Sequence, residues 1–180
     1  MAAAKPASLR AKAADLLSSL LYRNATVFRL RMNLYPPYLG AGIRVTRVSA
    51  DFREIDVELR RSPGNANAFG THFGGSLYAM VDPFYCLQFF AGLGSGYLVW
   101  DKAAKIEFVR PGKGTVRARF RISEADIQAA RDATATGGKY LPVFHVDVLD
   151  AGGAVVAKVE KELYVRRKPD RNKRSGAAPG

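Results

Sequence analysis

The sequence predicts one α+β domain, an antiparallel sheet with a very apolar helix on one face. Two features of the 180-residue chain carry this prediction. Runs with alternating or β-branched apolar residues follow one another between Gly and Pro turn signals, which favours antiparallel neighbours. One apolar run, residues 76–93, is too long for a strand and demands burial on nearly all sides. With 48% apolar residues the chain buries enough surface to fold unaided.

The N-terminal part predicts an amphipathic helix over residues 8–23, where leucines recur at near-helical spacing. Two interpretations remain open: docking on the same domain or a dimer partner, and association with a membrane surface. We expect Pro36-Pro37 to end any helix and start an extended chain. The expected organisation is an N-terminal helix and linker at 1–37, the main domain at 38–166 and a disordered basic tail at 167–180.

Six strands are predicted within the main domain, and a short helix or loop insertion is predicted at 123–138. The strands span residues 42–49, 53–61, 97–110, 114–122, 140–149 and 154–166. Gly and Pro mark the turns between them, so consecutive strands are expected to pair as hairpins.

Most of the net charge of +12 resides at the two ends of the chain. Residues 34–165 carry sixteen basic and fourteen acidic side chains, so the body is nearly neutral. Basic ends attract anionic partners without specificity, and no specific nucleic-acid reader is predicted. The longest uncharged run is a poor membrane span, no secretory signal is seen, and the single Cys86 fits a reduced compartment. The expected location is the cytoplasm.

The segment from Asn67 to Asp82 carries the strongest chemical signal, a Gly-rich polar loop that feeds the apolar helix. Backbone N–H groups in the first turn of a helix lack intrahelical partners, and the helix dipole adds positive potential there. Such a helix start can hold a carbonyl oxygen that becomes negative during acyl transfer. Gly74 and Gly75 let a substrate approach the backbone closely.

At this segment the sequence resembles the hotdog-fold acyl-CoA thioesterases of the phenylacetate-pathway type, in particular a little-characterised bacterial branch. The matching pattern is Asn67-x-x-Gly70-Thr71-x-x-Gly74-Gly75 with Asp82 after it, then Trp100-Asp101-Lys102-Ala103 and Phe108-x-Arg110-Pro111-Gly112. The resemblance covers residues 38–166. It implies a curved antiparallel sheet wrapped round a long central helix, homodimers or homotetramers, and acyl-CoA sites at a dimer interface.

The resemblance also implies roles for individual residues. Asp82 would act as general base or nucleophile toward the thioester, Asn67 would order substrate or water, and Gly74 would supply the oxyanion N–H. A further site position falls near Asp101. The implied reaction is hydrolysis to free acid and coenzyme A. No cofactor is implied, since coenzyme A is part of the substrate.

Substrate contacts are predicted at Gly75, His72 and Asp101, with Arg110 and Lys113 toward the phosphates of coenzyme A. Arg117, Arg119 and Arg121 could join this docking surface or form a solvated face of their strand. No metal is predicted, because two histidines 73 residues apart and one cysteine give no ligand spacing.

Each predicted role has a structural alternative. Asp82 precedes Pro83 and could cap a second helical segment after a kink. Asn67 could be a turn residue, and His72 could be a hydrogen bonder within the loop. Phe73 stands where the family usually has His directly before the Gly pair, which favours a second function: a non-catalytic protein that binds acyl-CoA or an acyl lipid.

Overall fold

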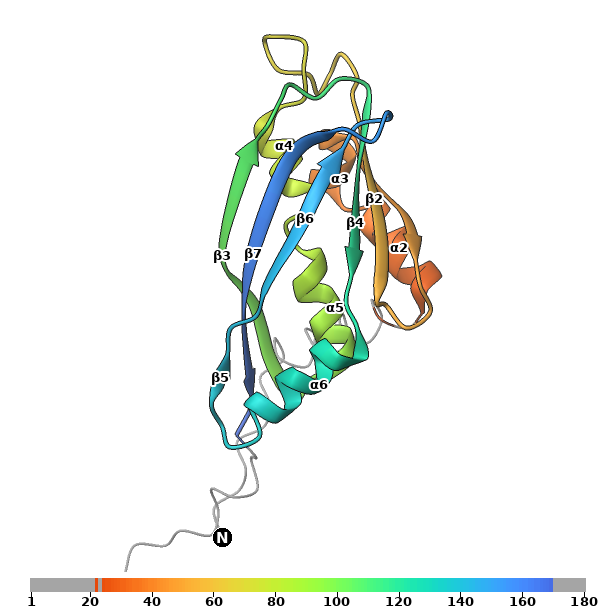
Figure 1. Ribbon diagram of the computed structural model, residues 1–180. Helices are drawn as coiled ribbons and strands as arrows, with labels where there is room; N and C mark the ends of the chain where they lie inside the picture. The colour runs from red at the N-terminus through yellow and green to blue at the C-terminus, as the bar shows by residue number, and fades with distance from the viewer. Residues whose placement is uncertain (1–21, 23, 170–180) are drawn as a thin grey trace, which may run out of the picture.

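The computed structural model describes residue 22 and residues 24–169, which form a curved antiparallel sheet with helices on one face (Figure 1). Its strands are β1 (Ile43–Val48), β2 (Glu54–Arg60), β3 (Tyr97–Phe108), β4 (Thr115–Arg121), β5 (Lys139–Tyr140), β6 (Val143–Leu149) and β7 (Val155–Arg167). They lie in the order β1-β2-β4-β6-β7-β3, and the short β5 pairs with β7. The predicted α+β class is confirmed, and the architecture is the hotdog fold.

In two places, strands that are consecutive in the chain pair as predicted hairpins, and in one place they do not. The β1–β2 and β6–β7 hairpins are confirmed. The expectation that β3 pairs with the strand that follows it is wrong, because β3 lies beside β7 at one edge of the sheet and β4 lies between β2 and β6. The chain between β3 and β4 therefore crosses the end of the sheet, where it meets the loop that precedes the apolar helix (Figure 1).

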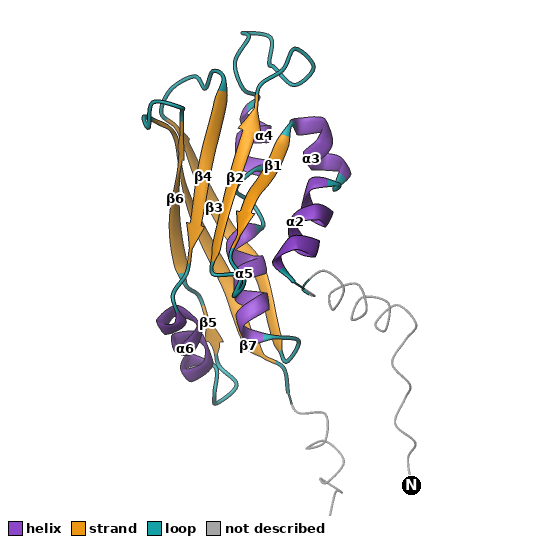
Figure 2. Ribbon diagram, turned by 90° about the vertical axis from the view of Figure 1, so that its right-hand side faces the viewer, coloured by secondary structure: helices purple, strands orange, loops and turns teal. Residues whose placement is uncertain are grey.

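The central helix consists of two segments, α4 (Gly74–Ala79) and α5 (Phe84–Leu93), which follow one another along the face of the sheet (Figures 1 and 2). The break between them lies at Pro83, whose ring removes an N–H donor and disfavours a continuous helix. Apolar side chains of both segments fill the core; Met80, Phe84 and Phe89 are 0% exposed. The break is where the chain turns Asp82 toward β3 and β7.

Two helices before the first strand, α2 (Ala25–Asn33) and α3 (Pro36–Ala41), cover the β1 edge of the sheet (Figure 2). Asn33 donates from Nδ2 to the Val45 carbonyl at 3.0 Å and accepts from the Val45 N–H at 2.7 Å. Its side chain therefore provides hydrogen-bond partners for the backbone of Val45 at the outer edge of β1. The expectation of an extended chain from Pro36 is wrong. Two prolines fit the first turn of a helix, where no N–H donor is needed. The helix predicted at 8–23 lies outside the described residues except for Tyr22, which packs on Phe28.

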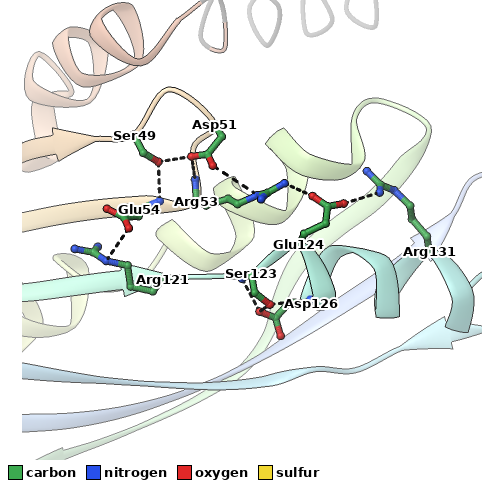
Figure 3. A network of polar contacts seen from close by, with 9 residues as sticks. All are labelled: Ser49, Asp51, Arg53, Glu54, Arg121, Ser123, Glu124, Asp126 and Arg131. Atoms are coloured by element: carbon green, nitrogen blue, oxygen red, sulfur yellow. Dashed lines mark hydrogen bonds and ion pairs between the residues drawn. The ribbon is translucent and has the colours of Figure 1, made fainter.

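The insertion at 123–138 contains α6 (Glu124–Ala133), which is fixed to the opposite end of the sheet by polar contacts (Figure 3). Ser123 and Asp126 form a capping box at its N-terminus. Glu124 pairs with Arg53 in the β1–β2 turn, and also with Arg131 at 3.1 Å. α6 lies at the other end of the sheet from the loop that precedes α4 (Figure 1).

β7 runs to Arg167, and the next residue is still tied to the domain. Lys168 donates its backbone N–H to the Gly96 carbonyl at 2.9 Å and its Nζ to the Ser95 carbonyl at 2.7 Å. Residues 170–180 lie outside the described part of the chain. Among the described residues, no helix is both long enough and apolar enough to span a membrane.

Candidate active site

The loop before α4 is fixed to the β3–β4 connection by His72. This side chain is 4% exposed, and its Nε2 lies 2.8 Å from the carbonyl of Gly114, so Nε2 carries the proton. The His72 backbone N–H donates to the Gly112 carbonyl at 3.1 Å. Burial lowers the pKa of His72 below its ordinary value. The ring is a neutral donor inside the protein, as the hydrogen-bonding alternative predicted.

We predict that His72→Ala lowers the free energy of unfolding by about 1–3 kcal/mol, because it removes the Nε2 donor and leaves the Gly114 carbonyl without that partner. His72→Gln, which keeps a donor, should cost less. The lowered pKa gives stability that is present above the unfolded value near 6.5 and is lost as the pH falls below it. Chemical denaturation at pH 5 and pH 8 measures both effects. Equal pH dependence in the wild type and His72→Gln would contradict the burial of a neutral ring.

Asn67 organises the same loop from within. Its Oδ1 accepts from the N–H groups of Phe69 and Thr71 at 2.9 and 3.0 Å. Its Nδ2 donates to Thr71 Oγ1 at 2.9 Å and to the His72 carbonyl at 3.1 Å. Both donors and both lone pairs of the amide are therefore engaged within the loop, an Asx-turn arrangement. In this arrangement the amide holds the chain that leads to Gly74, and its role toward substrate or water stays a prediction.

The start of α4 presents two backbone donors without a partner. No described residue accepts a hydrogen bond from the N–H of Gly74 or Gly75, and Phe73 at the N-cap gives no side-chain cap. A pocket of about 390 Å³ opens beside Gly74. It is lined by Asn67, Thr71, His72, Gly74, Leu77 and residues 108–112. A short helix start in a half-apolar pocket matches the oxyanion-holding arrangement that the sequence predicts.

Two aromatic rings crowd the glycines at the helix start. A Cβ atom at Gly74 would lie 3.1 Å from Cζ of Phe108, and one at Gly75 would lie 2.4 Å from Cε1 of Phe73. Glycine at both positions is therefore explained by close approach of the rings. Phe73 and Phe108 are 58% and 53% exposed, so much of the surface of both rings is uncovered, and Phe108 lines the pocket.

The carboxylates lie in a second cluster, centred on a lysine that the sequence did not indicate as a site residue. Lys161 of β7 is 0% exposed, and its Nζ lies 3.0 Å from Oδ1 of Asp82 and 3.0 Å from Oδ1 of Asp101. The contact with Asp82 is a hydrogen bond. The contact with Asp101 has the distance of an ion pair without hydrogen-bond geometry, and this buried Asp101 oxygen has no hydrogen-bond partner. The structure thus brings the two predicted carboxylates together.

Each member of the cluster comes from a different element. Asp82 lies in the break between α4 and α5, and Asp101 lies on β3 next to a bulge between Asp101 and Ala103. Lys161 occupies an inward position of β7, between the buried Val159 and Leu163. That alternation is the signal that could have found Lys161, because a lysine in an inward register is unusual unless it is paired.

The groups around this cluster are neutral near pH 7. Tyr78 accepts from Lys161 Nζ at 3.4 Å, and burial, followed by the neighbouring Asp82, raises its pKa. Burial raises the pKa of Cys86 to about 12, with Asp101 adding to the shift. Burial also raises the pKa of Asp101 itself, against the pull of the ammonium group, while the two carboxylates raise the pKa of Lys161. The lysine is therefore charged and is not a nucleophile at neutral pH.

The capping alternative for Asp82 is not what the structure shows. α5 has Pro83 at its N-cap and no side-chain cap, and the Asp82 carboxylate instead accepts from Lys161. The Asp82 side chain is 46% exposed, so part of the carboxylate remains within reach of solvent. The carboxylate is both held by Lys161 and accessible, as a general base requires.

The helix start and the carboxylates do not form one pocket within a chain. Asp82, Asp101 and Lys161 are not among the residues that line the pocket beside Gly74. They lie at the far end of α4, whose six residues rise about 1.5 Å each. No group of three or more His, Cys, Asp or Glu side chains within the described residues has the arrangement of a metal site.

The predicted coenzyme A contacts fall in two places. Arg110 lines the pocket beside Gly74, where its Nε donates to the Val155 carbonyl at 2.8 Å. Lys113 is exposed in the same β3–β4 connection. The β4 arginines lie on the other face of the sheet beside the acids of β2. Arg117 pairs with Glu58 at 3.0 Å and Arg121 pairs with Asp56 at 2.8 Å, so much of the positive charge of the β4 arginines is neutralised by acids of β2.

Residues 23–165 match the family described as domain of unknown function DUF4442, and the chain belongs to this family. No curated protein sequence matches it significantly. Solved structures share its hotdog fold at low sequence identity.

The first of three such structures is a protein of unknown function from Pseudomonas aeruginosa, described as a probable thioesterase, with TM-score 0.71, 19% identity, and 79% of this chain and 95% of that chain covered. A thioesterase of Haemophilus influenzae has TM-score 0.60, 17% identity, and coverage of 82% and 93%. The Escherichia coli PaaI protein of the phenylacetic acid degradation operon has TM-score 0.53, 16% identity, and coverage of 85% and 96%. The predicted resemblance to hotdog thioesterases is confirmed at the level of fold.

Proposed function

We propose that the protein hydrolyses acyl-CoA thioesters to a free acid and coenzyme A. The observation that carries this proposal is the start of α4, where the N–H of Gly74 borders a pocket of about 390 Å³ and the N–H of Gly75 follows it, neither of them with an acceptor among the described residues. These donors would hold the thioester oxygen as it becomes negative. Asp82 would take a proton from water as the water oxygen bonds to the acyl carbon. The C–S bond then breaks, and the leaving sulfur takes that proton from Asp82 to give the thiol.

The reacting groups would come from two copies of the chain. β3 is an edge strand, and Trp100 and Phe108 on it are 45% and 53% exposed. An unpaired edge with exposed apolar side chains is a surface that a second copy can cover. A two-fold pairing there would bring the Asp82 of one chain toward the Gly74 of the other and create two equivalent sites. We therefore propose a homodimer, alone or within a tetramer, as the active form.

A panel of acyl-CoAs with aliphatic and aromatic acyl groups, with detection of the free thiol, tests the proposal directly. We expect turnover of at least one member. A second candidate function, binding of acyl-CoA or an acyl lipid without turnover, is favoured by Phe73, whose ring lies against Gly75. Calorimetric binding of a nonhydrolysable acyl-CoA thioether by a protein that releases no thiol from any member of the panel would favour this second function.

We predict that Arg110→Met raises KM for acyl-CoA about tenfold and leaves kcat nearly unchanged, as expected when a charge-assisted phosphate contact is lost. Arg110 is 42% exposed at the pocket and is tied to the domain through the Val155 carbonyl. Arg119→Met on the opposite face is the matched control, since it removes the same charge away from the pocket. Equal effects of the two substitutions on KM would mean that only the net charge matters.

A further inference from the structure

The Asp82–Asp101–Lys161 cluster has an arrangement that a simple base does not need. Both carboxylate oxygens lie 3.0 Å from one ammonium nitrogen, so they are no more than about 6 Å apart, a separation at which like charges shift each other's ionisation. The Asp101 side chain is 24% exposed against 46% for Asp82, so Asp101 is the less solvated of the two.

Within the described part of the chain, no other charged group lies at ion-pair distance from Asp82 or Asp101. The remaining titratable side chains that act on Asp82, Asp101 or Lys161 are Tyr38 of α3, Tyr78 of α4 and Cys86 of α5. The pKa of each is raised mainly by burial, so each is neutral at physiological pH. Lys102, the other lysine near Asp101 in the chain, pairs with Glu162 at 2.8 Å instead. Among the described residues, Lys161 is thus the cation that lies within ion-pair distance of both carboxylates.

We propose that Lys161 is a positioning residue that neutralises Asp101 and thereby keeps Asp82 ionised and directed to the open side of the cluster. The catalytic role given to Lys161 rests on the proposed function. Its effect on the ionisation of the two carboxylates does not depend on whether the protein turns over thioesters. Lys161 is fully buried and its hydrogen bonds go to Asp82 and Tyr78, so it would act through Asp82 and not on the substrate.

The test compares Lys161→Met, Asp101→Asn and the double variant with the wild type, all as full-length protein. Carbon-13 NMR of the aspartate carboxyl groups follows the titration, with the Asp82 signal identified by its absence in Asp82→Asn. In Lys161→Met we expect the upper apparent pKa of the carboxylate pair to rise by about one to two pH units over wild type. In the double variant Asp101→Asn/Lys161→Met only one carboxylate remains, and its pKa should return to within about half a unit of the wild-type value.

The single variant Asp101→Asn keeps the inference falsifiable if Lys161→Met does not fold. Asp82 would then face a whole ammonium charge, so its apparent pKa should fall below the wild-type value. An unchanged or raised value would overturn the inference. So would a rise in Lys161→Met that persists in the double variant, since that would assign the effect to burial and not to Asp101.

Turnover measurements separate this inference from the proposed function. If the enzyme is active, the acid limb of kcat/KM for Lys161→Met should move to higher pH by the same amount as the NMR titration and return in the double variant. A purely structural role for Lys161 would lower activity at all pH values without this return. Absence of thioester turnover together with the predicted titrations would refute the proposed function and leave the ionic role of Lys161 standing.

Discussion

Asp82→Asn is expected to lower thioester turnover by roughly 10² or more, because the variant loses the carboxylate that would take the proton from water. The fold should survive. Lys161 keeps Asp101 at 3.0 Å, and an asparagine oxygen can still accept from Nζ. The variant should therefore unfold at nearly the wild-type temperature. Steady-state kinetics with the best acyl-CoA of the panel and thermal unfolding by circular dichroism measure the two quantities.

Asp147→Asn on β6 is the matched control, since it removes the same charge from an exposed side chain and should leave kcat within about twofold of wild type. Retained turnover in Asp82→Asn would refute Asp82 as the base. A large drop in unfolding temperature with retained turnover would assign the residue a structural role, through its contact with Lys161.

The sequence predicted the strands well because their periodicity is local. Alternation over 53–61 and 114–122 gave β2 and β4 to within a residue or so at each end. The pairing of β3 with β7 was not predictable in the same way, since strand neighbours depend on contacts between distant residues. The prediction of an extended chain from Pro36 was wrong because proline ends a helix only when it lies inside one. At the first turn, where Pro36 begins α3, proline favours the helix.

The residues of the candidate site likewise separate into those that a local sequence motif predicts and one that it does not. Gly74 and Asp82 were indicated by a motif that is contiguous in the sequence, and the structure places Gly74 at the start of α4 and Asp82 in the break between α4 and α5. Lys161 was missed, because it belongs to a strand 79 residues beyond Asp82 and its importance comes from a three-way contact across elements. Its inward register between Val159 and Leu163 was the one local sign.

The largest remaining consequence of the fold is the separation of the oxyanion donors from the base. An attacking group must come within about 3–3.5 Å of the acyl carbon. The pocket beside Gly74 does not include Asp82, and α4 lies between them. A thioester bound at Gly74 would therefore be served by the Asp82 of a second chain. Each dimer would hold two sites, and each site would contain one glycine from one chain and one aspartate from the other.

Gly74→Pro removes the donor with little other change. Phe73 before it has φ −66° and ψ 128°, which a residue preceding proline accepts, and position 74 is the first of the helix. Gly74→Ala adds the same Cβ near Phe108 while keeping the N–H, so it controls for the steric effect. We expect Gly74→Pro to lose about 10²–10³ in kcat and Gly74→Ala to lose much less.

Mixed dimers of Gly74→Pro and Asp82→Asn chains, purified through two different tags, are expected to regain about half of wild-type turnover from two nearly inactive parents. In such a dimer one shared site carries both lesions and the other carries neither. If each site instead used the Gly74 and Asp82 of one chain, every site would keep one lesion and the mixture would stay inactive. Size-exclusion chromatography establishes that both parents dimerise, so that inactive heterodimers count against the shared site and not against assembly.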